Sequence, residues 1–561
     1  MSKKLKIALL VAGGIAASVV LAMVAILLFL DLNAHKPRLE AAASDALGME
    51  VRLGGRMGIG FFPGFHVALD NVLIRCGGTD FITAAKATAG IELLPLLRKE
   101  VRIGRIVITN PRISVVRDRD GTFNFEKRTK KQDGKPGAEG GEPLPDQVFG
   151  KISLSNGSFL YTDQRSGERI EIGAFDLEIN RLRIPGGKSS DLVARLSFQA
   201  DFACKELRKG TLEVSDIRIR IEGKDGVYVI RPAAASRLVY SGTEGKVTAD
   251  RLTLGVQDLA FGGDPGAEFF RRASFTGSGE IAEIRTKEIA VSGFNFSTRG
   301  KNGVLDIDPV AMRIFGGQGS GNMHADFSGN VPLLHVRFSL SKFRVEEFLK
   351  TASPKKTGEG PMDISADLSM RGTTAKEMKR TANGSVSLRG ENLTLKGTDI
   401  DGVISRFEES QGFNIVDVGA YFFAGPFGSL LTKGYEFSSI YGSGSGSTRI
   451  RKLVSDWTVE RGVAQAKDVA MATDRNRIAL KGRLDFVGER FDDVTVALID
   501  KNGCVRLRQK IYGPFNKPTV DKASTLETLA APVLKLFQQT KKLLSGGKCE
   551  IFYAGSVAPP E

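Results

Sequence analysis

The chain opens with an apolar run from Ile7 to Leu30 that holds no charged residue and follows Lys3, Lys4 and Lys6. Its length of about 24 residues exceeds the roughly 20 that a helix needs to cross a bilayer. The exit sequence Leu30-Asp31-Leu32-Asn33 offers no small-x-small cleavage site. The run therefore predicts an uncleaved membrane anchor, with a cleaved signal peptide as the alternative. The preceding lysines predict a cytoplasmic N-terminus and an exported body.

The exported body carries most of a formal net charge of +15 in a chain of 561 residues. A basic body outside the cytoplasm suits an anionic partner such as lipid head groups, whereas nucleic acid is disfavoured by that location. The alternative is that lysines and arginines only solvate strand faces. The four cysteines are too few for a disulfide-rich scaffold, and their spacing leaves open whether Cys504 and Cys549 pair or stay as free thiols.

Alternation of apolar and polar residues dominates the chain beyond residue 50. Strict alternation is typical of antiparallel strands with one dry and one wet face. Sixty-five glycines and many short strand patterns predict a large, mainly β body. The residues on the dry phase of the three clearest strands are the candidates for an apolar groove: Ile217, Ile219, Ile221, Val336, Phe338, Leu340, Val494, Val496 and Leu498.

Short turns and a few helices complete the pattern. Pairs such as Asn156-Gly157, Asp225-Gly226 and Asn383-Gly384 are typical of hairpin turns. Pro37 to Leu47 predicts a helix that ends at Gly48. A basic amphipathic helix is expected in the last segment. Its lysines are candidates for a membrane surface, unless the helix packs on the end of the sheet: Lys535, Lys541 and Lys542.

Two segments rich in charge, glycine and proline predict linkers, because they have little to bury. They divide the chain into an anchor, three β regions and a tail. The expected boundaries are 1–30 for the cytoplasmic end and anchor, 31–126 for the first region, 127–146 for a linker, 147–350 for the central region, 351–361 for a second linker, 362–521 for the last β region and 522–561 for the amphipathic helix and tail.

Signals of catalysis are missing from the sequence. It contains no H-E-x-x-H, no paired C-x-x-C and no phosphate-binding G-x-x-x-x-G-K-[ST] loop. Its four histidines are scattered, and His335 falls on the wet phase of an alternating strand. Acidic pairs such as Asp492-Asp493 lie at strand ends beside turns, where carboxylates are ordinary. We therefore expect no enzyme, no catalytic residue, no metal and no cofactor.

Several fragments, in order along the chain, resemble the AsmA family of envelope proteins. Near the N-terminus these are Asp31–Glu40, Ala46–Gly48, Leu93–Leu97, Ile106–Ser114 and Asp120–Phe125. Farther along they are Asn302–Pro309, Phe315–Gly317, Gly390–Gly402, Gln411–Ala420 and Ile511–Pro518. The last residues, Cys549–Ser556, depart from the general pattern of the family.

The resemblance implies a single-pass inner-membrane protein whose bulk lies in the periplasm. It also implies a long, curved antiparallel sheet, open as a trough, with a few short capping helices and an apolar face that holds lipid acyl chains. The implied function is movement of phospholipid between the inner and outer membranes in outer-membrane biogenesis. The expected partners are phospholipid or another envelope lipid and the inner membrane through residues 7–30, with outer-membrane or envelope proteins left open.

Three alternatives remain at this point. One is an envelope hydrolase acting on lipid or glycan, which would need a pocket that gathers carboxylates or a histidine. The same anchored body could serve as an assembly or regulatory factor for outer-membrane proteins without moving lipid. The dry phase of the strands could also form a closed core instead of an open groove, since both structures require the same alternation.

Overall fold

The computed structural model describes most of the chain, and the structural statements below concern those residues. They are 32–60, 64–76, 78–92, 103–125, 147–184, 196–243, 245–260, 273–352, 358–397, 399–402, 404–405, 446–521, 524–525, 549 and 551–560. None of the helices found within these ranges is both long and apolar enough to cross a membrane. The apolar run 7–30, the linker 127–146 and the three tail lysines Lys535, Lys541 and Lys542 lie outside them.

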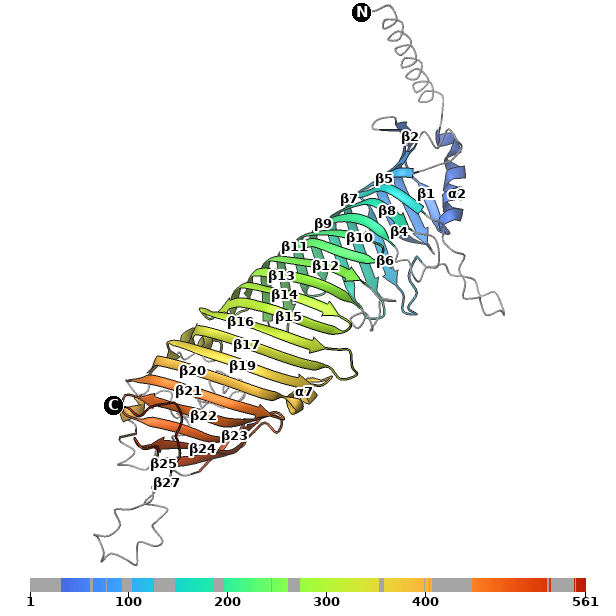
Figure 1. Ribbon diagram of the computed structural model, residues 1–561. Helices are drawn as coiled ribbons and strands as arrows, with labels where there is room; N and C mark the ends of the chain where they lie inside the picture. Colours follow the sequence, from blue (N-terminus) through green and yellow to red (C-terminus); the bar gives the residue numbers. More distant parts are fainter. Residues whose placement is uncertain are drawn as a thin grey trace, which may run out of the picture. The chain divides into compact units, whose positions relative to one another are not determined.

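The described chain is mainly β, as predicted, with few helices (Figure 1). Helix η1 (Leu32–His35) leads into α2 (Lys36–Leu47), which ends at Gly48 with a left-handed φ of 65°. This confirms the helix predicted from Pro37 to the glycine. Helices α6 (Val345–Ala352) and α7 (Ala375–Thr381) are short, and Thr374 caps α7 by accepting a hydrogen bond from the Glu377 amide.

The chain divides into two compact units. The N-terminal unit comprises 1–269 and 274–279, and the C-terminal unit comprises 270–273 and 280–561. The boundary between the units thus falls inside 147–350, which the sequence analysis treated as one central β region. The expected domain boundaries stay a prediction. Gly358–Glu359, within the second expected linker, forms a short strand that pairs with Leu395 and Thr394.

The N-terminal unit is built of long strands, most of which pair with their neighbours in sequence. They are β1 (Glu50–Leu53), β2 (Met57–Gly60), β3 (His66–Cys76), β4 (Thr79–Ile91), β5 (Ile103–Thr109), β6 (Arg112–Arg117), β7 (Gln147–Asp163), β8 (Arg169–Ile184), β9 (Ser197–Lys209), β10 (Leu212–Lys224), β11 (Val227–Gly242) and β12 (Gly245–Ala260), with β13 (Ser274–Arg285) at the boundary.

The sheet is mixed, so the expectation of a purely antiparallel sheet was wrong at one place. Strands β5 and β6 both run parallel to β7, with Ile106 opposite Ile152 and Ile113 opposite Phe159. One long strand thus spans two short ones that follow each other in the chain. Every other strand pair with a described register is antiparallel, as the alternation predicts.

Helix α2 and the turn before it cap the first edge of this sheet through side chains. Edge strands expose unpaired amides that invite pairing with other chains. Here the Val51 amide donates to Ser44 Oγ at 2.9 Å and the Leu53 amide donates to Glu40 Oε1 at 2.7 Å. The Met57 amide in β2 donates to Asn33 Oδ1 at 3.0 Å. Polar residues of the segment after the apolar run therefore close the edge.

The C-terminal unit continues with antiparallel strands. They are β14 (Ala290–Lys301), β15 (Val304–Ile314), β16 (Gly317–Asp326), β17 (Leu333–Arg344), β18 (Gly358–Glu359), β19 (Pro361–Arg371), β20 (Asn383–Lys396), β21 (Ser447–Glu460), β22 (Val463–Thr473), β23 (Arg477–Asp485), β24 (Arg490–Ile499), β25 (Val505–Pro514), β26 (Thr519–Val520) and β27 (Ser524–Thr525). The predicted turn at Asp225-Gly226 is confirmed.

Two predicted turns are not turns. Asn156-Gly157 lies inside β7, where Asn156 adopts a φ of 52° and the pairing with β8 shifts register. Asn383-Gly384 begins β20. Asparagine tolerates the left-handed region whether it sits in a hairpin or in a bulge, so the dipeptide alone does not distinguish the two. Bulges of this kind increase the local twist of the strand.

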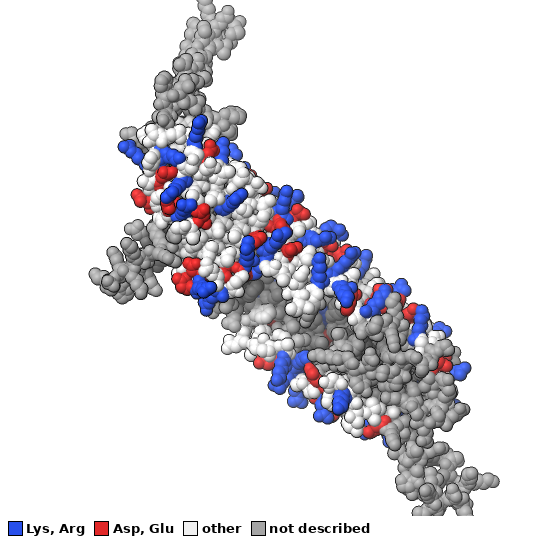
Figure 2. All heavy atoms as spheres, turned by 180° about the vertical axis from the view of Figure 1, so that it is seen from behind, with Lys and Arg blue, Asp and Glu red and all other residues white. Residues whose placement is uncertain are grey.

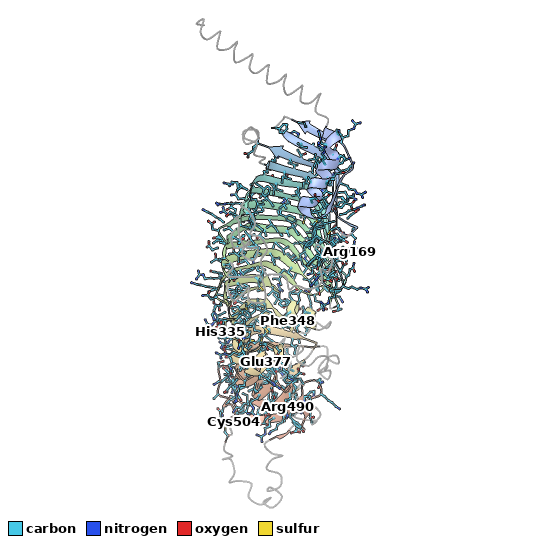
Figure 3. All side chains as sticks on the ribbon, turned by 90° about the vertical axis from the view of Figure 1, so that its right-hand side faces the viewer. Arg169, His335, Phe348, Glu377, Arg490 and Cys504 are labelled. Atoms are coloured by element: carbon cyan, nitrogen blue, oxygen red, sulfur yellow. A yellow bond between two sulfur atoms is a disulfide. The ribbon has the colours of Figure 1, made fainter. Side chains whose placement is uncertain are left out.

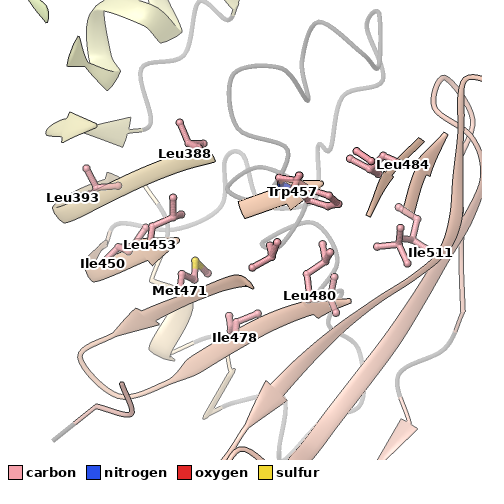
Figure 4. Packing of buried hydrophobic residues seen from close by; sticks show 14 of the residues in the cluster. Leu388, Leu393, Ile450, Leu453, Trp457, Met471, Ile478, Leu480, Leu484 and Ile511 are labelled. Carbon is pink, nitrogen blue, oxygen red and sulfur yellow. The ribbon is translucent and has the colours of Figure 1, made fainter. Parts of the chain in front are cut away.

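The last strands of the C-terminal unit surround a closed core. Ile450, Leu453 and Ile478 are fully buried there and pack beside Met471 and Trp457 (Figure 4). Within β22, Val469 and Met471 face this core while Ala470 and Ala472 face a second cluster on the opposite side. Among the described strands, β22 is therefore buried on both faces.

Candidate functional site

Strand β10 shows the predicted alternation at its clearest. Ile217, Ile219 and Ile221 are half-buried on one face, whereas Arg218 and Arg220 are exposed on the other. Neighbouring strands set apolar residues opposite them, since Ile219 pairs with Phe202 and Ile217 with Cys204. Directly opposed residues share one face of a sheet. The three isoleucines therefore belong to a common apolar face.

That face extends across most of the N-terminal sheet as cross-strand rows. One row crosses ten strands, from β2 through β5 and from β7 through β12. Its members are Ile59, Val67, Ala89, Ile106, Ile152, Ile179, Ala200, Ile221, Ile230 and Val256. With strands about 4.8 Å apart, nine steps make an apolar row about 43 Å long. Pairing alone places residues nearly 200 positions apart in one line.

A second row lies beside the first and is bulkier. Its members are Met57, Leu69, Ala87, Ile108, Leu154, Leu177, Phe202 and Ile219. Next to it the Phe175 ring stacks 6.2 Å from that of Phe202 and lies over Gly157. A Cβ at Gly157 would approach Phe175 Cζ to 2.4 Å, so glycine at this position makes room for the ring.

The opposite face of the same strands is polar and held by cross-strand ion pairs. Arg220 contacts Asp201 at 2.5 Å, and Lys151 contacts Glu178 at 2.7 Å. Figure 2 shows basic and acidic side chains interspersed over the face in view. Exposed pairs of this kind contribute little stability each. Their effect is to keep one face hydrated while the other stays apolar.

Nothing described in the N-terminal unit covers the apolar face as a second layer would. Helix α2 packs on β1 and η1 on β2, both at the sheet edge. Most members of the two rows are accordingly half-buried, not buried. Contiguous apolar surface left open in this way marks binding sites for lipid, membrane or protein. The arrangement can therefore hold an elongated apolar ligand.

Most of the predicted groove residues in the C-terminal unit are more deeply buried than those in β10. Val494, Val496 and Leu498 in β24 are each 1% exposed and lie in the closed core. Leu340 in β17 is also buried, whereas Val336 and Phe338 are half-buried and Phe338 packs against the rim of that core. The same alternation thus produces a sealed interior in β24 and an open face in β10. Of the predicted groove residues, the structure brings together the three isoleucines.

Two of the four histidines, His335 and His324, form ordinary ion pairs with aspartates. His335 Nε2 lies 2.6 Å from Asp367 Oδ1 on the polar face of β17, the phase predicted for it. This hydrogen bond is the main cause that lowers the pKa of Asp367, and Arg337 adds to it. His324 pairs with Asp306 at 2.6 Å. Within the described residues, no group of three histidine, cysteine, aspartate or glutamate side chains is placed to hold a metal.

The disulfide left open by the sequence is present. Cys504 and Cys549 are bonded with Cα atoms 5.5 Å apart (Cys504 is labelled in Figure 3). Forty-five residues separate the two, and only the fold brings them together. Sequence reasoning also missed the segment after Cys549, in which Phe552, Tyr553 and Val557 are buried against the sheet. The one signal in the sequence was that Cys549–Ser556 depart from the general pattern of the AsmA family.

The chain is thus a mainly β protein whose N-terminal sheet leaves one apolar face open, and its described residues include no metal-binding cluster. A model of the AsmA family matches residues 1–225 and 280–467. The chain therefore belongs to the AsmA family, which confirms the resemblance seen in the fragments. No curated protein and no solved structure matches it.

Proposed function

We propose that this protein binds lipid acyl chains along the apolar face of its N-terminal sheet and helps move phospholipid between the inner and outer membranes. Family membership is consistent with a role in the cell envelope. The observation that carries the proposal is the half-buried apolar row across ten strands. In this proposal residues 7–30 anchor the chain in the inner membrane, and the body lies in the periplasm.

The size of the apolar face suits an acyl chain. Half of a bilayer's hydrocarbon core is about 15 Å thick, so a row of about 43 Å accommodates two chains end to end. Each methylene moved from water to an apolar surface gains about 0.8 kcal/mol, which makes a dry lining effective for carrying lipid across an aqueous space. The ion-paired opposite face remains in water. Such a carrier needs no catalytic residue, and we propose that the protein is not an enzyme.

The disulfide supports the proposed location. Structural disulfides form and persist in oxidising compartments such as the periplasm. The Cys504–Cys549 bond is therefore what a body exported by an N-terminal anchor would carry.

Two adjacent substitutions on β10 test the proposal. Ile219→Asp places a carboxylate on the apolar face, whereas Arg218→Asp places the same group on the polar face one residue away. We expect the first to abolish co-purifying phospholipid, measured by mass spectrometry of the extracted full-length protein, and the second to retain it. Lipid retained in both folded variants would contradict the proposal. An Ile219→Asp protein that unfolds would identify the face as a closed core, and Ile219→Ser provides a milder version.

A further inference from the structure

The C-terminal residues 551–560, here called the strap, lie against strands β21–β25 on the side opposite the main core. Phe552, Tyr553 and Val557 of the strap pack in one buried cluster with residues of the sheet. The sheet members of that cluster are Val454, Ala470, Ala472, Ala479, Ala497, Ile499 and Val505. Among the described residues, the strap is the segment that covers this second apolar face.

Small side chains allow the strap to lie close. Ala470, Ala479 and Ala497 are fully buried although each offers only a methyl group. The backbone of Gly503 lies so close to the strap that a Cβ at this position would be 2.1 Å from the Tyr553 carbonyl oxygen, which leaves room for glycine only. The Phe552 amide donates to the Gly503 carbonyl at 2.8 Å. The strap thus packs in close contact with the sheet.

Polar contacts fix the strap in register. Arg477 is buried, donates from Nη1 to the Val557 carbonyl at 3.0 Å, and lies 5.7 Å from the centre of the Tyr553 ring. The Tyr553 hydroxyl donates to Asp468 Oδ1 at 2.5 Å, and the Ser556 amide donates to Asp468 Oδ2 at 3.0 Å. Strands β22 and β23 each supply one of these anchors.

The disulfide sets how strongly the strap is held. While Cys504–Cys549 is closed, Tyr553 is tethered to the sheet through about four residues. Once it opens, the preceding strand residue along the chain is Thr525 of β27, and about seven times as many residues separate it from Tyr553. Effective concentration falls roughly as the −3/2 power of tether length, so docking would weaken about 20-fold.

We propose that the strap is a latch controlled by thiol–disulfide exchange, which seals the second apolar face when Cys504 and Cys549 are bonded and uncovers it when they are reduced. A dithiol supplies the reaction. Its thiolate attacks one sulfur of the bond and its second thiol completes the exchange. Two electrons and two protons pass to the chain, both cysteines become thiols, and the dithiol becomes a disulfide. The latch does not depend on the proposed lipid binding.

Proteolysis of the full-length protein tests the latch. Chymotrypsin cuts after Phe552 or Tyr553, both buried while the strap is docked. We expect dithiothreitol to speed release of the C-terminal peptide about 20-fold, as measured by mass spectrometry. A Cys504→Ser/Cys549→Ser protein should be cut at the fast rate with or without dithiothreitol. Cys76→Ser, which leaves the bond intact, should behave like the unaltered chain.

The single tryptophan separates release of the strap from unfolding. Trp457 lies in the main core, on the other side of the sheet. We expect its emission to stay unchanged when the strap is released. Equal cleavage of oxidised and reduced protein would overturn the proposal, because the bond would then not control docking. A red shift of Trp457 that accompanies cleavage would also overturn it, since the bond would then be a staple for the whole unit.

Discussion

The phenolic hydroxyl of Tyr553 donates a hydrogen bond to Asp468, which precedes it by 85 residues, and the Val557 amide donates to the same hydroxyl at 3.1 Å. This one oxygen atom thus bonds both Asp468 of β22 and the backbone of Val557, four residues farther along the strap. Burial is the main cause that raises the pKa of Tyr553, and its hydrogen bond to Asp468 adds to the rise. The phenol is therefore held in its protonated, donating form.

Removing this hydroxyl should loosen the strap. Tyr553→Phe leaves the Val557 amide without its acceptor and Asp468 with one donor fewer. We expect this to weaken the free energy of strap docking by about 1–2 kcal/mol. We expect chymotrypsin to cut the strap about 5–30 times faster. Tyr512→Phe is the matched control, since Tyr512 is exposed and its hydroxyl donates to Asp521 Oδ1 at 3.2 Å, away from the strap. Equal effects of the two changes would contradict the role given to Tyr553.

Acid should release the strap through Asp468. Burial is the largest single influence and raises the pKa of this carboxyl, but hydrogen bonds from Ser556 and Tyr553 outweigh it, so the pKa lies below its ordinary value. A depressed pKa means that the stabilisation is complete above the unfolded value of about 3.9 and is lost as pH falls below it. Pepsin cleavage of the strap between pH 5 and 2 should therefore accelerate in the unaltered chain. Asp468→Asn should remove most of this dependence.

Truncations should distinguish the sealed core from the open face. Ile478→Ala empties a site that is 0% exposed and should cost about 2–5 kcal/mol of unfolding free energy. Ile219→Ala acts on a half-buried side chain with no covering layer, and should cost about 1 kcal/mol. Urea denaturation followed by circular dichroism measures both. A loss at Ile219 as large as that at Ile478 would show that the N-terminal face is covered.

Gly157→Ala should strain the apolar face. The new methyl group would collide with the Phe175 ring, and overpacking of this kind costs about 1–3 kcal/mol. Shortening the neighbour in Gly157→Ala/Phe175→Leu should recover part of the loss. Gly173→Ala serves as the control because a Cβ at Gly173 meets nothing within 4 Å. Denaturation midpoints of the three proteins test the contact, and equal midpoints for Gly157→Ala and Gly173→Ala would refute it.

Local pattern predicted the strands well and their surroundings poorly. The alternation of Ile217, Ile219 and Ile221 identified β10 and its two faces, and the helix from Pro37 was predicted by proline and glycine at its ends. The same alternation in Val494, Val496 and Leu498 could not show that these residues are sealed. Burial depends on which element lies above a strand, and that element comes from a distant part of the sequence.

Pairings between distant segments were equally out of reach. The parallel approach of β5 to β7 and the bond between Cys504 and Cys549 are set by how the sheet is assembled. The bulge at Asn156 has the sequence of a turn because both geometries accept asparagine at positive φ. The strap lies beyond the residues that match the family, so the resemblance offered no guide to it.

The side chains of Ser44 and Glu40 that occupy the amides of Val51 and Leu53 have an effect beyond the single molecule. Unpaired amides along a strand edge allow copies of a chain to pair edge to edge and build fibrils. Because Ser44 and Glu40 of the same chain already accept from these two amides, neither is available to the edge strand of another copy.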